Sequence, residues 1–398
     1  MGEWKSFQVG EIGKVITGKT PKTSISDNYG GYIPFLTPSD DMSVKYVRKT
    51  AKTLTEKGLS EVKNAILPAN SVCVSCIGSD LGKVVITTRP TVTNQQINSI
   101  VVDEARFDIS FVYYAMRILG KKLNFISKTS TAVPIVNKSS FSSYEIECPS
   151  LKEQKQIAAV LSVLDAKIEC NRMINDNLMQ HAVTIFKSWF VEYSPFDGIE
   201  PKEWETVNLE KITSLISRGI APKYSDNSDQ IVINQKCIRN HMIDLSQART
   251  HTPKVINEKW LRFGDLLINS TGDGTLGRAA QVWFQPQNIT VDSHVTVVRP
   301  AKENLIFYIG LWGVLHEREI ESLHTGSTGQ TELPKERVKA LELHLPDNGT
   351  LDCFNTLIAP MAAAIVSKQN ENNKLATLRD ALLPKLMSGE IDVSAVQL

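Results

Sequence analysis

Two long stretches of this chain carry apolar residues in steps of alternately four and three, one after residue 150 and one near the C-terminus. Such heptad spacing predicts helices with a narrow apolar seam that packs against a partner helix. Adding 197 to a residue number carries the first seam onto the second in the same register, with polar residues at the same central steps. The sequence therefore predicts two matching long helices, at 151–192 and 349–398, that pack antiparallel against each other. The seam expected between them consists of Ile157, Leu161, Leu164, Ile168, Asn175, Leu178, Ile185, Ile358, Met361, Ile365, Asn372, Leu375 and Leu382.

The predicted helices are long enough to act as a spacer. Forty residues at 1.5 Å each form a rod of roughly 60 Å. Asn175 and Asn372 stand at equivalent steps of the two seams, where they are expected to cost stability but to fix the axial alignment. Pro360 predicts a kink or a late start of the second helix, and Pro384 predicts an end or a bend in its last turns. An ordinary helix-packing core with no measuring role is the alternative interpretation.

The segments that precede the two helices also repeat. Gly18 matches Gly219, and each follows an apolar run, has a basic residue beside it and is followed by a proline, which predicts the start of a loop. Strand-like alternation with one or two helices predicts an α+β domain of about 150 residues, present once in 1–150 and again in 193–348. The predicted fold class is α+β, with two similar domains separated by two long antiparallel coiled-coil helices and a pseudo-two-fold internal repeat.

Composition and charge narrow the class of protein. A chain of 398 residues, 42% apolar and 22% charged, is expected to form two or more soluble domains. It shows no signal-peptide pattern and no run of 18 apolar residues, so the prediction is a cytoplasmic protein without a membrane segment. The net charge is only +1, which excludes a strongly basic nucleic-acid binder. If DNA is the ligand, binding depends on local basic loops or on a partner.

Motifs for chemistry are weak. Cys73 and Cys76 form a lone C-x-x-C that the second domain lacks, and buried free thiols on a strand explain it better than a zinc site. Residues 272–277 fit G-x-G-x-x-G, but the following residues look strand-like, which favours a hairpin turn over a nucleotide site. No P-loop, methyltransferase motif or nucleophile–base pair is visible in the sequence. We therefore assign no catalytic, cofactor-binding or metal-binding residue to this chain.

Several short motifs, in order and spacing, carry a family resemblance. The run Pro149-x-x-x-x-Gln154-x-x-Ile157-x-x-x-Leu161 opens the first helix, and Phe186-Lys187-Ser188-Trp189-Phe190 closes it. Pro201-x-x-Trp204 opens the second domain, Thr93-Asn94-Gln95-Gln96 lies inside the first, and residues 382–391 end the second helix. Together they resemble the specificity subunit of type I DNA restriction–modification enzymes, over essentially the whole chain.

The resemblance implies a function as well as a fold. Each domain would be a target-recognition domain that reads one half of a bipartite double-stranded DNA target, and the paired helices would set the gap. The helices would also bind two methyltransferase subunits, which a motor-nuclease subunit joins. S-adenosylmethionine, ATP and magnesium would be used by those partners, so this chain would be non-catalytic. One departure is Asp292-Ser293-His294 where the first domain has Asn94-Gln95-Gln96, which leaves open whether this turn has the same role in both domains.

Candidate DNA contacts are basic, hydroxyl and amide side chains in the repeated loops, because phosphate contacts position a protein and base-edge contacts give specificity. In the first domain they are Lys19, Thr20, Lys22, Lys83, Lys128, Thr129 and Ser130. In the second they are Arg218, Lys223, Tyr224, Arg278, His324, Ser327, Thr328 and Gln330.

Two other functions remain open from the sequence. The first is a coiled-coil scaffold protein with two protein-binding domains, which would show no DNA sequence preference and little salt dependence. The second is a self-sufficient methyltransferase, which would bind S-adenosylmethionine by itself.

Overall fold

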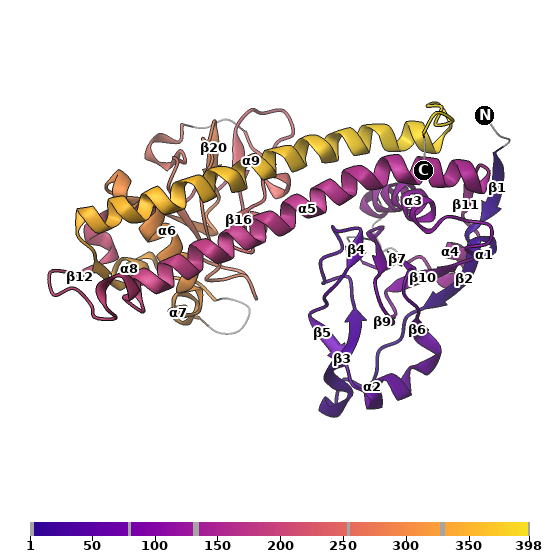
Figure 1. Ribbon diagram of the computed structural model, residues 1–398, viewed down its shortest axis with the longest axis horizontal. Helices are drawn as coiled ribbons and strands as arrows, with labels where there is room; N and C mark the ends of the chain where they lie inside the picture. The colour runs from indigo at the N-terminus through magenta and orange to yellow at the C-terminus, as the bar shows by residue number, and fades with distance from the viewer. Residues whose placement is uncertain (1–3, 79–80, 130–134, 253–254, 327–330, 397–398) are drawn as a thin grey trace. The chain divides into compact units, whose positions relative to one another are not determined.

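The computed structural model describes residues 4–78, 81–129, 135–252, 255–326 and 331–396, without the side chains of 128 and 129 (Figure 1). The chain divides into two compact units. Unit 1 comprises Met1–Cys170 and Glu371–Leu398, and unit 2 comprises Asn171–Asn370. Each unit therefore contains one α+β domain together with one half of each long helix.

The domain of unit 1 is built from two sheets and a strand pair. The larger sheet has the order β2 (Gly13–Thr17), β10 (Ile97–Val102), β7 (Val72–Ser75), β8 (Val84–Thr87) and β4 (Tyr46–Val47). The second sheet has the order β5 (Lys52–Leu54), β3 (Tyr29–Leu36), β9 (Thr91–Thr93) and β6 (Ile66–Leu67). Strand β1 (Lys5–Gln8) pairs with β11 (Glu145–Cys148). The helices are α1 (Val9–Ile12), α2 (Glu56–Glu61), α3 (Ile109–Thr129) and α4 (Lys138–Ser142).

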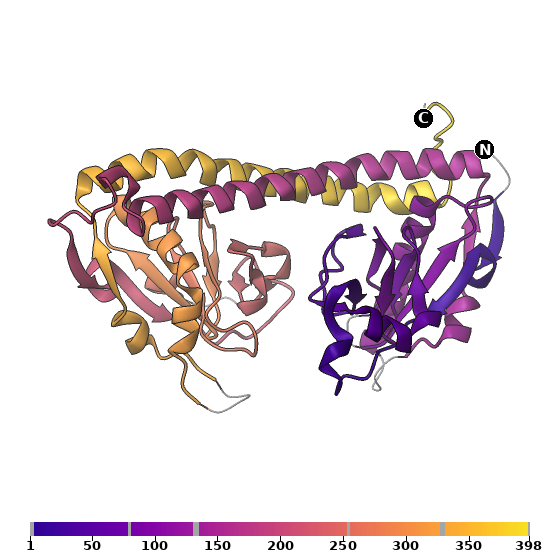
Figure 2. The same cartoon turned by 60° about the horizontal axis from the view of Figure 1, so that its bottom comes forward.

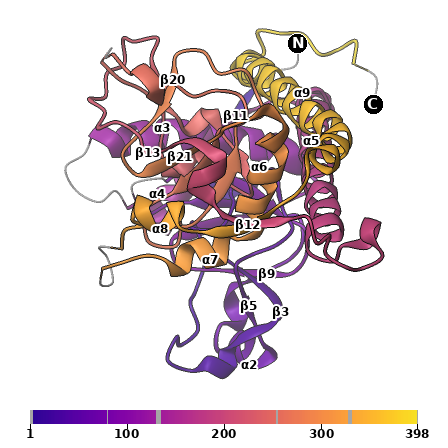
Figure 3. The same ribbon diagram turned by 90° about the vertical axis from the view of Figure 1, so that its left-hand side faces the viewer.

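Within the described residues, unit 2 repeats the strand order of both sheets without counterparts of β4 and β6. Several of its strands are labelled in Figure 3. Its larger sheet has the order β13 (Thr213–Arg218), β21 (Val295–Pro300), β18 (Leu266–Asn269) and β19 (Ala279–Gln281). The second sheet has the order β17 (Arg249–Thr250), β14 (Ile231–Ile233) and β20 (Ile289–Val291). Two strand pairs complete it, β12 (Glu205–Asn208) with β22 (Glu342–Leu345), and β15 (Ile238–Arg239) with β16 (Met242–Ile243). The helices are α6 (Ile306–Leu315), α7 (Glu317–Ser322) and α8 (Lys335–Lys339). The predicted internal repeat of an α+β domain is confirmed.

Strand β7 shows why the central strands read as continuous apolar runs. Val72 and Val74 lie in the core that includes α3. Cys73 points the other way, into a core shared with Leu36 of the second sheet. Both faces of the strand are therefore buried, as expected of a sheet covered on both sides. The prediction of buried free thiols is confirmed for Cys73 and Cys76.

The long helices α5 (Leu151–Phe190) and α9 (Asn348–Met387) are antiparallel in both units (Figures 1 and 2). In unit 1, Leu161 of α5 and Leu386 of α9 share one core, and Lys167 pairs with Glu371. In unit 2, Phe190 stacks edge-on against Phe354, with ring centroids 4.8 Å apart. The predicted antiparallel helix pair is confirmed.

Two details of the predicted helices are wrong. Helix α9 neither starts late at Pro360 nor ends at Pro384, since it runs to Met387, whereas the alternatives of a kink at Pro360 and a bend at Pro384 stay predictions. It also does not fill the predicted range 349–398. Gly389 adopts a left-handed φ of 74°, which ends the helix, and Val393 then packs into the core of unit 1. Helix α5 likewise ends at Phe190, two residues before the end of the predicted range 151–192.

Every predicted seam residue is buried or half-buried. Ile157, Leu161, Ile358 and Ile365 are at most 1% exposed, and Asn175 is 3% exposed. The Asn372 amide donates a hydrogen bond to the Ile168 carbonyl oxygen on the other helix, at 3.3 Å. The seam residues therefore lie on the inward faces of the helices, although they share those faces with the domain cores.

Among the helices of the described residues, α9 alone is long and apolar enough to cross a membrane by length and composition. Phe354 and Ile358 on this helix lie in the core of unit 2, and Leu383 and Leu386 lie in the core of unit 1. One such helix is weak evidence of a membrane span, and 28% of its apolar window is buried in the structure.

Candidate functional site

In unit 1, three loops meet at one end of the larger sheet. Strands β2 and β7 are both antiparallel to β10, so the ends of β2 and β7 lie beside the start of β10. The Gly18 amide donates to the Ile97 carbonyl oxygen at 3.1 Å, and the Cys76 amide donates to the Gln96 carbonyl oxygen at 2.7 Å. We call residues 18–22, 76–78, 81–83, 94–97 and 135–136 loop cluster 1.

A tight turn at Asn94 forms the centre of loop cluster 1. The Asn94 side-chain oxygen accepts a hydrogen bond from the Gln96 amide at 3.1 Å. The Asn94 amide in turn donates to the Leu36 carbonyl oxygen at 3.0 Å, which ties the turn to the second sheet. Gly18 passes so close that a Cβ on it would lie 2.1 Å from the Asn94 carbonyl oxygen. Only glycine fits at that position without moving the turn.

Unit 2 contains the same turn despite its different residues. The Asp292 carboxylate accepts from the His294 amide at 2.9 Å, and the Asp292 amide donates to the Ile233 carbonyl oxygen at 2.9 Å. A Cβ on Gly219 would lie 2.0 Å from the Val291 carbonyl oxygen. Asparagine and aspartate close such a turn equally well, because both offer a side-chain oxygen two residues before the donor. The backbone role of the turn is therefore the same in both units.

The electrostatics of the two turns differ. The carboxylate of Asp292 is 2% exposed, and burial raises its pKa, although the His294 amide and side chain oppose the shift. Asn94 carries no charge at the equivalent place. The imidazole Nδ1 of His294 lies 2.7 Å from the Thr271 hydroxyl. The turn of unit 2 thus has a buried acid and a histidine where the turn of unit 1 has amides.

A third segment joins each loop cluster. The Val136 amide donates to the Cys76 carbonyl oxygen at 2.8 Å, and the Leu333 amide donates to the Ser270 carbonyl oxygen at 2.8 Å. We call residues 219–224, 270–278, 291–295, 324–325 and 332–333 loop cluster 2. The Ser/Thr-containing segments 129–132 and 326–330 lie shortly before 135–136 and 332–333 in the sequence. Of the residues predicted there, Ser130, Ser327, Thr328 and Gln330 lie outside the described residues.

Four of the remaining predicted residues of unit 1 belong to loop cluster 1. Lys19, Thr20 and Lys22 are exposed in the loop that follows β2. The Thr20 hydroxyl donates to the Gln95 side-chain oxygen at 2.5 Å, so this loop contacts the turn directly. Lys83 is half-buried just before β8. Lys128 and Thr129 end α3, and their side chains are outside the described part of the chain.

The predicted residues of unit 2 divide into two groups. Arg218 ends β13, forms an ion pair with Glu332 and donates to the Leu333 carbonyl oxygen at 2.8 Å, so its guanidinium ties the third segment to the sheet. Arg278 donates to the Gly274 carbonyl oxygen at 2.7 Å and closes the glycine-rich turn. Lys223 and Tyr224 are exposed in the loop after β13, and His324 is exposed after α7.

Sequence reasoning missed Arg249. Its guanidinium carbon lies 3.7 Å from the centroid of the Tyr224 ring, and the side chain is exposed. Arg249 pairs with Val232 on β14, as Lys52 pairs with Phe35 on β3, so both units place a cation at the same strand position. A stacked guanidinium keeps the donors along its edge available, which suits bidentate recognition of a base. No spacing in the sequence marks Arg249, because the sheet brings it to Tyr224.

The structure offers little of the chemistry that an active site needs. Residues 272–277 connect the antiparallel strands β18 and β19, so the predicted hairpin turn at G-x-G-x-x-G is confirmed. Burial raises the pKa of the Cys73 thiol to about 12 and that of Cys76 to about 11, which keeps both thiols protonated at neutral pH. Within the described residues, no group of three or more His, Cys, Asp and Glu side chains is placed to hold a metal ion.

Comparison with known proteins gives consistent matches. The family model of the type I restriction modification DNA specificity domain matches residues 1–180 and 201–359. The type I restriction enzyme MjaIX specificity subunit of Methanocaldococcus jannaschii is 28% identical over 98% of this chain and 94% of that protein. The HindI specificity subunit of Haemophilus influenzae is 33% identical over 43% of this chain and 38% of that protein. A crystal structure of the type I restriction–modification S subunit from M. genitalium shares the fold, with a TM-score of 0.52, 15% identity and coverage of 97% of this chain and 96% of that one.

Proposed function

Because the model of type I restriction modification DNA specificity domains matches most of its length, this chain belongs to that family, and we propose how it reads DNA. Each α+β domain binds one half of a bipartite target through its loop cluster. The paired helices α5 and α9 set the gap between the halves and dock two methyltransferase subunits.

The observation that carries this proposal is the repeated loop cluster. The two clusters share the backbone of the central turn and the close approach of Gly18 or Gly219, but they differ in the side chains they display. A shared backbone structure that displays different side chains suits two domains that recognise different DNA sequences. The nearly neutral net charge of +1 means that phosphate attraction must come from local cations, of which Lys19, Lys52, Lys223 and Arg249 are exposed.

Catalysis in this proposal belongs to partner subunits. The methyltransferase subunits would bind S-adenosylmethionine, and the motor-nuclease subunits would use ATP and magnesium. Family membership and the names of the relatives, which are specificity subunits of type I restriction enzymes, support this division of labour. The complex would act in the cytoplasm.

A binding experiment with matched variants tests the DNA contacts of unit 1. Lys19 directly follows β2 and Lys14 lies near its start, and both are exposed. The target is first identified by sequencing methylated DNA from cells that carry the complete system. In titrations with the methyltransferase partner, Lys19→Ala should weaken binding and reduce the salt slope by about one, whereas Lys14→Ala should change neither. Equal effects of the two variants would contradict the assignment of loop cluster 1.

Arg249 allows a sharper test in unit 2. Arg249→Lys keeps the charge but loses the planar fork. If the stacked guanidinium reads a base, both Arg249→Ala and Arg249→Lys should relax discrimination at one base pair by about 1–3 kcal/mol. Lys211, at the opposite end of β13, provides the control, since Lys211→Ala should leave discrimination unchanged. Binding without sequence preference by the wild-type complex would instead support a protein-binding scaffold.

A further inference from the structure

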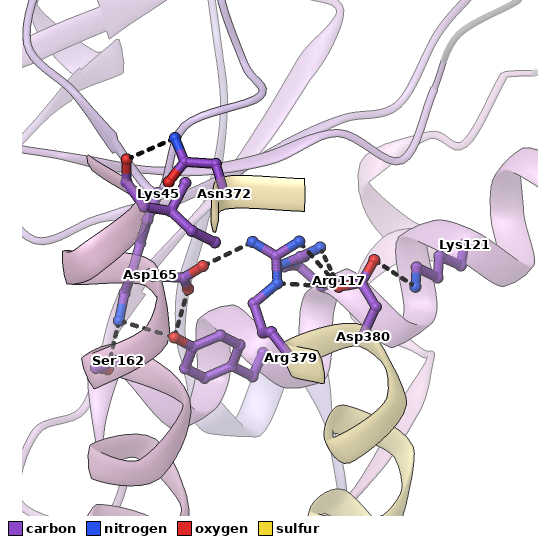
Figure 4. Close-up of polar contacts among 10 residues, drawn as sticks. Lys45, Arg117, Lys121, Ser162, Asp165, Asn372, Arg379 and Asp380 are labelled. Carbon is purple, nitrogen blue, oxygen red and sulfur yellow. Dashed lines mark hydrogen bonds and ion pairs between the residues drawn. The ribbon is translucent and has the colours of Figure 1, made fainter. Parts of the chain in front are cut away.

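An ionic network with a buried centre and an exposed end at Lys121 lies in unit 1 where the domain meets the two long helices (Figure 4). At its centre the Asp165 carboxylate of α5, 8% exposed, accepts hydrogen bonds from two elements. Arg379 of α9 donates to it at 2.7 Å, and the Tyr114 hydroxyl of α3 donates to it at 2.5 Å. One carboxylate therefore links both helices to the domain.

Lys45 adds a second link from the domain. It lies just before β4, and its carbonyl oxygen accepts from the Ile86 amide of β8 at 2.8 Å. Its ammonium donates to the Ser162 hydroxyl of α5 at 2.7 Å and to the Ser110 hydroxyl of α3 at 3.0 Å. The same ammonium lies 4.8 Å from the centroid of the Tyr114 ring. This lysine, only 9% exposed, thus joins the larger sheet to α5.

Asp380 of α9 completes the network. Arg379 and Arg117 lie 2.9 and 3.2 Å from one of its carboxylate oxygens, and Lys121 of α3 lies 3.6 Å from the other. Burial alone would raise the pKa of Asp380, but Arg379, Arg117 and Lys121 hold it below its ordinary value. Helix α3 is therefore attached to α9 by charge as well as by packing.

Unit 2 shows that the fold does not require this network. By the 197-residue repeat, Asp165 corresponds to Ala362 and Arg379 corresponds to Ala182, and both alanines are buried in the core of unit 2. The alignment of Tyr114 with Tyr308 places Leu311 and Leu315 where α3 has Arg117 and Lys121. The same architecture thus has apolar side chains at these positions in unit 2, where Asn304 of the domain forms uncharged hydrogen bonds with Asn348 and Asn355 of α9.

The difference has a physical consequence. Apolar contact is non-directional, and replacing a buried ion pair by apolar residues is often neutral or stabilising. Ionic hydrogen bonds are directional, because donors and acceptors must meet in one geometry. The fold does not need the network for its stability. The presence of the network is explained if it selects one orientation of the domain on the helices.

We propose that Lys45, Tyr114, Arg117, Asp165, Arg379 and Asp380 form an ionic joint that fixes the orientation of the first domain on the helix pair. The consequence rests on the proposed function: the joint makes the complex discriminate against targets whose gap is one base pair longer or shorter. These are positioning residues, since they act through the placement of loop cluster 1.

A distance measurement tests the joint without DNA. Cys170 and Cys353 are the exposed cysteines. After Cys353→Ser, one spin label is attached to Cys170 on α5 and a second to Ser60→Cys on α2, both in unit 1. We expect a narrow distance distribution in this labelled background and a broader one when Asp165→Ala and Arg379→Ala are added. The control removes Lys167 and Glu371, an exposed ion pair between the same helices, and should leave the distribution narrow.

The second measurement uses the complex with its methyltransferase partner. Binding is compared for the cognate duplex and for duplexes with the gap changed by one base pair. In the Asp165→Ala/Arg379→Ala variant the preference for the cognate gap should fall roughly tenfold, equivalent to about 1.4 kcal/mol, with the half-site bases read as before. The Lys167→Ala/Glu371→Ala variant should keep the preference.

An unchanged distance distribution or an unchanged gap preference in the joint variant would overturn the proposal. If the double variant does not fold, Tyr114→Phe removes only the hydrogen bond to Asp165, and it must shift both readouts in the same direction for the proposal to stand. Absence of any sequence preference in the wild type would refute the proposed function instead, and the distance measurement would still decide whether the joint fixes the domain.

Discussion

The two units attach an α+β domain to the same pair of helices with different side chains. Unit 1 adds the ionic joint around Asp165 to its apolar core, whereas in unit 2 Tyr308 of the domain packs against Phe186 and Phe190 of α5, with ring centroids 5.6 and 4.9 Å apart. The backbone topology is repeated, so it tolerates either solution. The chemistry of a packing surface is therefore free to diverge after duplication, provided that the shape is kept.

The largest effect is expected from a substitution in the aromatic core that joins the domain of unit 2 to the helices. Phe354 is fully buried and contacts Phe186, Trp189 and Phe190. We expect Phe354→Ala to lower the free energy of unfolding by about 3–5 kcal/mol, through lost burial and the cavity left behind. Five of the six tryptophans lie in residues 171–370, so tryptophan fluorescence during urea unfolding reports on unit 2. Leu357 on the same helix is 42% exposed, and a Leu357→Ala variant with an equal loss would contradict the prediction.

Breaking the ionic joint should cost almost as much, but in a different pattern. Arg379→Ala leaves the buried Asp165 carboxylate without its cation, and we expect a loss of about 3 kcal/mol. The double variant Asp165→Ala/Arg379→Ala removes both charges of the pair, so its loss should fall about 2 kcal/mol short of the sum of the single variants. Urea unfolding followed by circular dichroism measures all three. Additive losses would show that the two side chains do not act as a pair.

The glycines at the loop clusters test where the units are alike. A Cβ at Gly18 or Gly219 would lie 2.0–2.1 Å from a carbonyl oxygen of the facing turn. Gly18→Ala and Gly219→Ala should each destabilise by about 1–3 kcal/mol, as overpacking does, and should weaken DNA binding by displacing the turn. Gly198 is the control, because nothing lies within 4 Å of a Cβ placed there, although its φ of 75° makes alanine slightly strained. If Gly18→Ala and Gly219→Ala lowered the free energy of unfolding by different amounts, the two loop clusters would not be structurally equivalent at this contact.

The smallest expected effect is a pH dependence confined to the ionic joint. Burial lowers the pKa of Lys45 to about 8, although Asp165 and Asp108 oppose the shift and Arg117 adds to it. Between pH 8 and the ordinary lysine pKa of 10.5, the unfolded chain binds more protons at this group than the folded chain, so stability rises with pH. Relative to Lys45→Met, the wild type should gain about 1 kcal/mol between pH 7 and pH 9. If the difference in unfolding free energy between the wild type and Lys45→Met is constant over this pH range, burial does not lower the pKa of the Lys45 ammonium.

The sequence was informative where a contact depends on local spacing. The heptad steps from Ile157 and from Phe354 predicted both helices and their antiparallel packing, and the pairing of Gly18 with Gly219 located corresponding loops. It could not predict the end of α9, because a proline costs one hydrogen bond that the packing of Leu383 and Leu386 outweighs. The sequence aligned the turn at Asp292 with that at Asn94 but left its role open, since the hydrogen bonds from backbone amides to the Asn94 and Asp292 side chains are seen only in the structure.

By itself the sequence determined the duplication, the periodicity of the helices and the family. Each is visible in short segments of the sequence, without knowledge of which residues they contact. Only the tertiary structure decided which residues from distant parts of the chain are in contact. Asp165 finds Arg379 more than 200 residues away, and Arg249 reaches Tyr224 through the pairing of the strands. Such partners are selected by packing and by the desolvation of charge. Both act between residues that are close in space, so no regular spacing in the sequence marks these pairs.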